Sequence, residues 1–184
     1  MAYRVTFLPG DGIGPEVAWA ARRCLDATGV AFQWDERAAG ETAIAKFATP
    51  LPDETLKAIQ DSRLAIKGPI TTPIGRGFRS VNVALRKSLN LFACVRPCRT
   101  YAGVRAPAKA VNLVIVRENT EDLYAGIEFA QGEPETAQII AQCQGRAQPP
   151  IPPDSAISIK PISVSGSERI VTFACEYALA HGRR

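Results

Sequence analysis

Histidine is almost missing from this sequence of 184 residues, which holds a single imidazole, His181, close to its last position. A Ser-His-Asp triad, a Cys-His pair and a His-rich metal centre all need an imidazole beside the other groups of the site. One imidazole near the end of the chain cannot supply any of them. The chemistry of this protein therefore does not depend on histidine.

Paired cysteines are missing as well. The five cysteines are an odd number and contain no CxxC spacing, which argues against a disulfide framework and a zinc knuckle. Cys24 and Cys175 fall on the apolar faces of predicted helices, so we interpret them as small core residues. All five cysteines are expected to be free thiols.

Long apolar runs are also absent. No stretch approaches the length of a membrane span, and the apolar run near the N-terminus is too short for the h-region of a signal peptide. The net charge of +4 is mild, and the basic residues are not interleaved with exposed aromatic residues, which argues against a nucleic-acid partner. We therefore expect a cytoplasmic globular protein with no membrane or nucleic-acid partner, whose positive charge suits a small anionic ligand.

What is present is a regular alternation of apolar runs and amphipathic segments, which indicates an α/β fold with a parallel sheet. The predicted strands are 3–8, 30–34, 64–67, 91–95, 111–116 and 156–162, and the predicted helices are 15–27, 53–59, 80–90 and 167–180. Asp53 is expected to cap its helix. The segment from about 130 to 153 is rich in Gln and Pro, so we expect a surface arm there and not part of a central sheet.

The segment 80–90 has the pattern of an amphipathic helix with a polar face. Apolar residues recur at every fourth position from Val81. Asn82 and Arg86 are also four positions apart, so they share a different face, and Ser80 stands at the helix N-terminus. The N–H groups and the dipole at a helix start favour anions. The segment therefore offers a hydroxyl, an amide and a guanidinium to a negatively charged ligand.

Two further arginines are expected at the carboxyl ends of strands, where ligands bind in open α/β folds. The strand 91–95 would deliver Arg96, and the strand 111–116 would deliver Arg117. Planar guanidinium groups match carboxylate oxygens with two parallel hydrogen bonds. Each arginine taken alone would be interpreted as a solvated charge on the surface. Together with the polar helix face, they predict a receptor for a small molecule with several carboxylates.

Neither of two turns identifies a cofactor by itself. GDGIGPE follows a strand, but its glycines do not complete the GxGxxG spacing of a dinucleotide fingerprint, because Pro15 occupies the last position. We interpret this motif as a tight strand-to-helix turn. Thr71 and Thr72 follow another strand, where their hydroxyls could reach a cofactor or cap a turn.

Four long motifs together carry a family resemblance: GDGIGPEV, KGPITTPIGRGFRSVNVALR, LFACVRP and RENTEDLYAGIE. With them the sequence resembles the metal-dependent decarboxylating β-hydroxyacid dehydrogenases of the isocitrate/isopropylmalate dehydrogenase family, and most closely the bacterial homodimeric isocitrate dehydrogenases. The resemblance runs through SISIKPISVSGSERIVTFACEYA and does not include the family's second half. It implies an α/β fold of the isopropylmalate dehydrogenase type. Residues 1–91 would form the first half of a large α/β domain, 92–124 and 161–184 part of a small domain, and 125–160 a Pro-rich clasp-like arm that joins the subunits of a homodimer.

The resemblance also implies roles for individual residues. Ser80, Asn82, Arg86, Arg96 and Arg117 would bind the substrate, Thr71 would lie near the cofactor, and Tyr124 would supply a proton to an enolate. Isocitrate dehydrogenases carry Ser and Asn at the positions of Ser80 and Asn82, and the extra carboxylate of isocitrate needs such hydrogen-bond donors. The implied reaction is the oxidative decarboxylation of isocitrate to 2-oxoglutarate, with NADP or NAD as hydride acceptor and Mg²⁺ or Mn²⁺ as Lewis acid. The similarity leans slightly towards NADP.

In the family, the catalytic lysine, the metal-binding aspartates and the loop for the adenosine part of the cofactor lie beyond the position that corresponds to Arg184. The resemblance therefore implies no metal ligand in this chain, an uncovered sheet edge and apolar face, and no turnover by the chain alone. Two alternatives stay open. One is a related dehydrogenase of the isopropylmalate, homoisocitrate or tartrate type, and the other is a non-catalytic substrate-binding or regulatory subunit.

Overall fold

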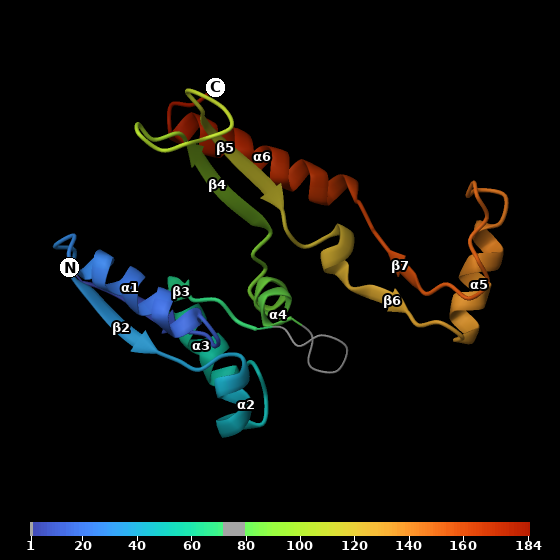
Figure 1. Ribbon diagram of the computed structural model, residues 1–184, viewed down its shortest axis with the longest axis horizontal. Coiled ribbons are helices and arrows are strands. Elements are labelled where there is room, and N and C mark those ends of the chain that lie inside the picture. The colour runs from blue at the N-terminus through green and yellow to red at the C-terminus, as the bar shows by residue number, and fades with distance from the viewer. Residues whose placement is uncertain (1, 72–79) are drawn as a thin grey trace. The chain divides into compact units, whose positions relative to one another are not determined.

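The computed structural model describes residues 2–71 and 80–184, and the chain divides into two compact units, residues 1–90 and 91–184. Each unit has sheets and helices of its own, which Figure 1 labels in chain order. No helix in the described ranges is long and apolar enough to cross a bilayer.

Unit 1 is built on a parallel three-stranded sheet. Its elements are β1 (Tyr3–Leu8), α1 (Gly14–Asp26), β2 (Phe32–Glu36), α2 (Glu41–Phe47), α3 (Asp53–Ser62), β3 (Ala65–Lys67) and α4 (Val81–Ser88). The strand order is β2-β1-β3, and the central strand β1 is buried from Val5 to Leu8. In the parallel register Phe7 lies opposite Glu36 on one side and Ile66 on the other. The carboxyl ends of β1 and β3 therefore meet at one edge of the sheet.

The core of unit 1 fixes α4 in place. A buried cluster joins the end of β1 to this helix, and its members are Leu8, Ala39, Val81 and Leu85. Leu89, just after the helix, packs against the cluster. Full burial of a side chain of this size stabilises a fold by about 1.5–3 kcal/mol. The predicted apolar stripe is confirmed, and the face that carries Asn82 and Arg86 is left half-buried beside it.

Unit 2 is built on two antiparallel strand pairs, β4-β5 and β6-β7. Its elements are β4 (Ala93–Arg99), β5 (Asn112–Glu118), the 3-10 helix η1 (Asp122–Ala125), β6 (Ile127–Phe129), α5 (Pro134–Cys143), β7 (Ile157–Ile159) and α6 (Val164–Ala180). α6 packs along the β4-β5 pair (Figure 1), and the rings of Phe92 and Phe173 meet there with centroids 5.7 Å apart. The Gln- and Pro-rich segment contains α5, and the strands on either side of it form a sheet of their own.

The α/β fold is confirmed, with one difference in the sheets. The expectation of a parallel sheet holds for unit 1 only, because both strand pairs of unit 2 are antiparallel. The strand expected at 156–162 is also shorter, since β7 holds three residues and pairs only with the equally short β6.

The prediction that Arg96 follows a strand is wrong. Arg96 lies in the middle of β4, because the strand continues through Pro97, which stands opposite Val114. Proline lacks the N–H of a ladder hydrogen bond, but an edge strand tolerates it when that position faces away from the partner. A proline therefore did not mark the end of this strand.

Two smaller predictions are wrong as well. Asp53 is the first residue of α3 and not its cap, since Pro52 is the N-cap residue and no side-chain cap is made. Cys24 and Cys175 are exposed. Each helix turns other residues towards its sheet, as the buried Ala18 of α1 shows, so these thiols lie on the surface and not in a core.

Candidate functional site

The loops that follow β1 and β3 approach each other closely at the carboxyl edge of the unit 1 sheet. The N–H of Asp11 donates to the Pro69 carbonyl oxygen at 3.1 Å. A Cβ atom on Gly10 would lie 1.9 Å from that oxygen, and one on Gly68 would lie 2.1 Å from the Pro9 carbonyl oxygen. The two loops fit only because these positions carry no side chain. This packing accounts for the first glycine of GDGIGPE without any ligand.

Asp11 is a buried carboxylate in this turn that sequence reasoning missed; its residue is 5% exposed. Its Oδ1 accepts the N–H of Thr71 at 2.6 Å, and its Oδ2 accepts the N–H of Glu41 at 2.9 Å. The carboxylate thereby joins the loops after β1 and β3 to the start of α2. Thr71, the predicted cofactor residue, is held at this edge, whereas Thr72 lies outside the described residues. An aspartate in a glycine turn was the available signal, because its short side chain readily binds nearby N–H groups.

The pKa of Asp11 lies below its ordinary value. Burial of the carboxyl group raises the pKa, but the hydrogen bonds from Thr71 and Glu41, with the nearby Lys67 ammonium, outweigh burial. A carboxyl group with a depressed folded pKa contributes stability above its unfolded pKa, which is near 4. That contribution is lost as the pH falls through the folded pKa.

Asp11→Asn is expected to lower the free energy of unfolding of unit 1 by about 2–3 kcal/mol at neutral pH, because the amide nitrogen that replaces one carboxylate oxygen cannot accept an N–H group and the remaining oxygen carries no charge. The variant should also lose less stability than the wild type between about pH 5 and pH 3. Urea unfolding monitored by tryptophan fluorescence measures the unfolding of unit 1 alone, since the only tryptophans of the sequence are Trp19 and Trp34. Asp61→Asn removes an exposed carboxylate of α3 as the control. Equal losses in the two variants would contradict the role of Asp11.

α4 carries three of the predicted substrate residues. Ser80 is its N-cap residue, and its side chain makes no capping hydrogen bond. Asn82 and Arg86 lie one turn apart on the same side, and both are half-buried. The pKa of Lys67, at the end of β3, lies below its ordinary value, first through burial and then through the positive charge of Arg86, while Asp11 acts in the opposite direction. Two cations held near each other favour an anion between them.

β4 and β5 bring two arginines to one face of their sheet. Cys94 lies opposite Arg117, and Arg96 lies opposite Ile115, so all four side chains point to the same face. The expectation that both arginines stand at carboxyl ends is wrong, because the carboxyl ends of antiparallel strands point in opposite directions. Register brings the arginines together as diagonal neighbours. A hydrogen bond with the Cys94 thiol raises the pKa of Arg96 above its ordinary value.

Tyr124 reaches Arg117 from η1. The guanidinium donates to the phenol oxygen at 2.5 Å, and its central carbon lies 4.9 Å from the centroid of the tyrosine ring. A cavity of about 290 Å³ adjoins this pair, and Asp122, Ser167 and Ile170 are among its other lining residues. The structure thus joins a guanidinium group to a phenol at one cavity of unit 2.

The carboxylates of two glutamates beside this pair accept hydrogen bonds from nearby backbone N–H groups. Glu118 accepts the N–H groups of Thr120 and Glu121, and Glu121 accepts the N–H and the hydroxyl of Ser163, at 2.5–2.9 Å. Ser163 in turn caps α6 by accepting the N–H of Gly166. Within residues 2–71 and 80–184, no three His, Cys, Asp or Glu side chains form a group that could hold a metal ion. These glutamates of the RENTED motif therefore position η1 and α6.

The predicted site residues are distributed over both units. Unit 1 holds Thr71, Ser80, Asn82 and Arg86, and unit 2 holds Arg96, Arg117 and Tyr124. Inside unit 2 the structure brings Arg117 into contact with Tyr124 and beside Arg96. That the site residues of unit 1 and those of unit 2 bind one and the same ligand stays a prediction.

Comparison with known proteins decides the family. The profile of the isocitrate/isopropylmalate dehydrogenase family matches residues 4–184. This chain belongs to that family. The curated isocitrate dehydrogenases [NADP] of Staphylococcus epidermidis and Archaeoglobus fulgidus are 46% and 44% identical to it, each over 98% of this chain.

Solved structures agree with this assignment. The isocitrate dehydrogenase of Methylococcus capsulatus has a TM-score of 0.81 at 46% identity, covering 99% of this chain and 49% of that one. A β-decarboxylating dehydrogenase of Thermococcus kodakarensis has a TM-score of 0.68 at 32% identity, covering 98% of this chain and 47% of that one. The two curated enzymes are covered over 46% and 45% of their lengths. This member of the family therefore spans about half the length of the relatives that it matches.

Proposed function

We propose that this chain binds isocitrate and supplies part of the machinery for its oxidative decarboxylation to 2-oxoglutarate. The observation that carries the proposal is the contact of Arg117 with Tyr124 at a cavity, in a chain of the isocitrate/isopropylmalate dehydrogenase family. An arginine that can bind a carboxylate beside a phenol that can donate a proton is the combination that a β-keto acid needs when it loses carbon dioxide.

The proposed receptor matches the charge of isocitrate, which carries three carboxylates. Arg86, Arg96 and Arg117 provide planar forks, each able to bind two carboxylate oxygens. Ser80 and Asn82 provide neutral donors at the start and on the half-buried side of α4. In 3-isopropylmalate an isopropyl group replaces the carboxymethyl group of isocitrate, so it would leave these donors without partners. The residues of α4 are therefore proposed to select the tricarboxylate.

Tyr124 is the proposed general acid. The guanidinium of Arg117 orients the phenol by donating to its oxygen, and the same contact stabilises the negative charge that remains after the proton has been given away. The cavity beside the pair would hold the carbon that receives this proton.

The cofactor groups of the family fit this chain to different extents. NADP or NAD, when bound, accepts a hydride from the substrate carbon. Thr71 suits a place beside it, because a Cβ on Gly12 would lie 3.1 Å from the Thr71 hydroxyl, and its absence leaves space at a sheet edge where such ligands bind. A divalent metal ion does not fit the described residues, since Asp11 and Glu118 are committed to N–H groups. The proposal for this chain is therefore limited to substrate binding, cofactor contact and proton transfer.

Calorimetric titration of the purified chain tests the proposed substrate. Isocitrate should bind more tightly than 3-isopropylmalate, and the double variant Ser80→Ala, Asn82→Leu should reduce that preference by about tenfold or more, since two donors to a carboxylate are lost. Ser88→Ala at the other end of α4 is the control and should leave the preference unchanged. An unchanged preference in the double variant would count against the proposed site.

A further inference from the structure

The turn between β5 and η1 determines where the phenol of Tyr124 stands. Residues 118–121 join the end of β5 to the start of η1, and the N–H of Tyr124 donates to the carbonyl oxygen of Glu121 at 3.2 Å. From η1 the phenol reaches back to the guanidinium of Arg117, which belongs to β5. A movement of the turn would therefore move the phenol relative to Arg117.

Glu118 closes this turn from the inside. Its carboxylate accepts the N–H groups of Thr120 and Glu121 at 2.9 and 2.8 Å, and it also accepts the hydroxyl of Thr120. Burial of the carboxyl group raises the pKa of Glu118, but these hydrogen bonds outweigh burial and hold the pKa below its ordinary value. The carboxylate is thus ionised at neutral pH although its side chain is only 22% exposed. Burying an ionised group is costly unless an opposite charge accompanies it.

Arg169, on α6, supplies the opposite charge. Its Nη2 atom lies 3.7 Å from Oε1 of Glu118 and donates to the hydroxyl oxygen of Thr120 at 3.1 Å. The guanidinium also lies over the ring of Phe92, with its central carbon 4.3 Å from the ring centroid. Phe92 precedes β4 in the chain, so the guanidinium contacts the residue before β4 and the turn after β5 at the same time. These contacts fix its position from two directions.

Arg169 reaches the turn from the side away from the candidate site. Glu118 and Arg117 are neighbours on β5, so their side chains point to opposite faces of the strand. The cavity beside Tyr124 is lined by Arg117 among others, and Arg169 is not one of the described residues that line it. Any effect of Arg169 on the phenol therefore passes through the turn.

We propose that Arg169 is a positioning residue for Tyr124, because it holds the turn 118–121 closed through Glu118 and Thr120 and thereby keeps the phenol at Arg117. The inference rests on the proposed function, which makes this phenol the general acid. Without the guanidinium of Arg169, the carboxylate in the turn loses a nearby cation and the Thr120 hydroxyl loses a donor, so the turn loosens. The strand that carries Arg117 stays paired with β4. The loss should therefore displace the proton donor more than it weakens substrate binding.

Fluorine NMR of the purified chain, with 3-fluorotyrosine in place of tyrosine, tests the position of Tyr124. The sequence has four tyrosines, and the resonance that is missing from Tyr124→Phe belongs to Tyr124. Arg169→Gln should shift and broaden this resonance, because the ring then exchanges between positions. The resonances of Tyr3 in unit 1 and Tyr177 on α6 should be unchanged, since neither ring contacts the turn.

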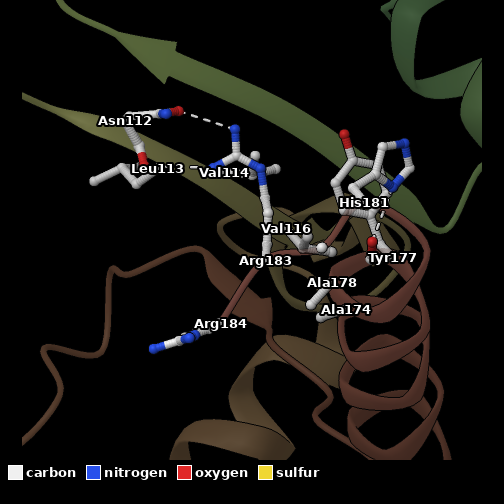
Figure 2. A pocket seen from close by; sticks show the side chains of 11 residues that line it. Asn112, Leu113, Val114, Val116, Ala174, Tyr177, Ala178, His181, Arg183 and Arg184 are labelled. Carbon is white, nitrogen blue, oxygen red and sulfur yellow. Dashed lines mark hydrogen bonds between the residues drawn. The ribbon is translucent and has the colours of Figure 1, made fainter.

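Arg183→Gln is the matched control. Arg183 follows α6 and joins it to the other end of β5, where it donates to the side-chain oxygen of Asn112 at 2.9 Å and to its backbone oxygen at 3.4 Å (Figure 2). This variant also removes an arginine between α6 and β5, but it should leave the Tyr124 resonance unchanged. Thr120→Val leaves α6 intact and should shift the resonance as Arg169→Gln does. The double variant of Thr120 and Arg169 should shift it little further, because the two residues act through one contact.

Calorimetric titration separates this inference from the proposed function. Isocitrate should bind to Arg169→Gln within about threefold of its affinity for the wild type, because Arg117 remains in place. A wild-type chain that does not bind isocitrate would contradict the proposed function, whereas a shifted Tyr124 resonance in Arg169→Gln would still support the positioning role. An unmoved resonance in Arg169→Gln or Thr120→Val, or an equal shift in Arg183→Gln, would overturn the inference. A loss of affinity as large as in Arg117→Gln would also overturn it, since Arg169 would then position the substrate-binding guanidinium and not the phenol.

Discussion

Gly10→Ala is expected to lower the free energy of unfolding of unit 1 by about 3–5 kcal/mol, since it adds steric overlap to an unfavourable backbone conformation. Gly10 has a φ of +81°, and its added Cβ would lie 1.9 Å from the carbonyl oxygen of Pro69. That oxygen is backbone and already accepts the N–H of Asp11, so it cannot turn aside as a flexible side chain would. A loss of this size is a large part of the roughly 5–15 kcal/mol that stabilises an ordinary domain.

Gly29→Ala separates the two costs. Gly29 has a φ of +79°, almost the same as Gly10, but no atom lies within 4 Å of the position that a Cβ would take. This variant should lose only the left-handed penalty of about 1–2 kcal/mol. Urea unfolding followed by the fluorescence of Trp19 and Trp34 measures both variants on the same unit. Similar losses in the two variants would show that the loops after β1 and β3 do not approach as closely as the structure has them.

The close approach at Gly10 connects the fold of unit 1 to its candidate site. The loop that carries Pro69 continues directly to Thr71, whose N–H is held by Asp11 from the opposite loop. A shift of one loop would therefore move the proposed cofactor contact. Dinucleotide fingerprints use their first glycine for a tight turn, and in this chain the first glycine of the turn, Gly10, also allows the close approach of a second backbone loop.

Sequence patterns predicted the parts of the fold that depend on neighbouring residues. β1 was predicted with its observed ends, and the stripe of α4 faces the core as its spacing requires. The carboxylates that bind backbone N–H groups were missed because their partners are distant in the chain. Asp11 binds N–H groups 30 and 60 positions away, and Glu121 binds Ser163 across 42 positions. No local pattern encodes such pairs.

Unit 2 shows a second reason why predictions from the sequence were wrong. An apolar pattern shows that a side chain can be buried, but it does not show which element covers it. Cys175 belongs to an apolar stripe and was therefore placed in a core, yet α6 has two apolar sides and β5 covers only one of them. Arg96 was expected beside Arg117 because both would stand at carboxyl ends, but antiparallel register is what makes the two residues diagonal neighbours. Register depends on strand pairing, which the sequence of one strand does not contain.

Arg117→Gln is expected to weaken isocitrate binding by about 50- to 100-fold, corresponding to the roughly 2–3 kcal/mol of a charge-assisted hydrogen bond that loses its cation. The prediction rests on the proposed function and is measured by calorimetric titration of the chain. Arg117→Lys should lose about tenfold, because it keeps the charge but not the planar fork. Arg99→Gln removes an exposed arginine from the end of β4 and should bind as the wild type does.

Tyr124→Phe distinguishes a binding role of this pair from a proton-transfer role. The variant keeps the ring on which Arg117 lies and removes only the hydroxyl that accepts its hydrogen bond. If Arg117 holds the substrate and Tyr124 only donates a proton later, binding should change by less than about threefold, well below the loss in Arg117→Gln. If the two variants lose affinity equally, Tyr124 acts by fixing the guanidinium, and the assignment of the general acid to this phenol is wrong.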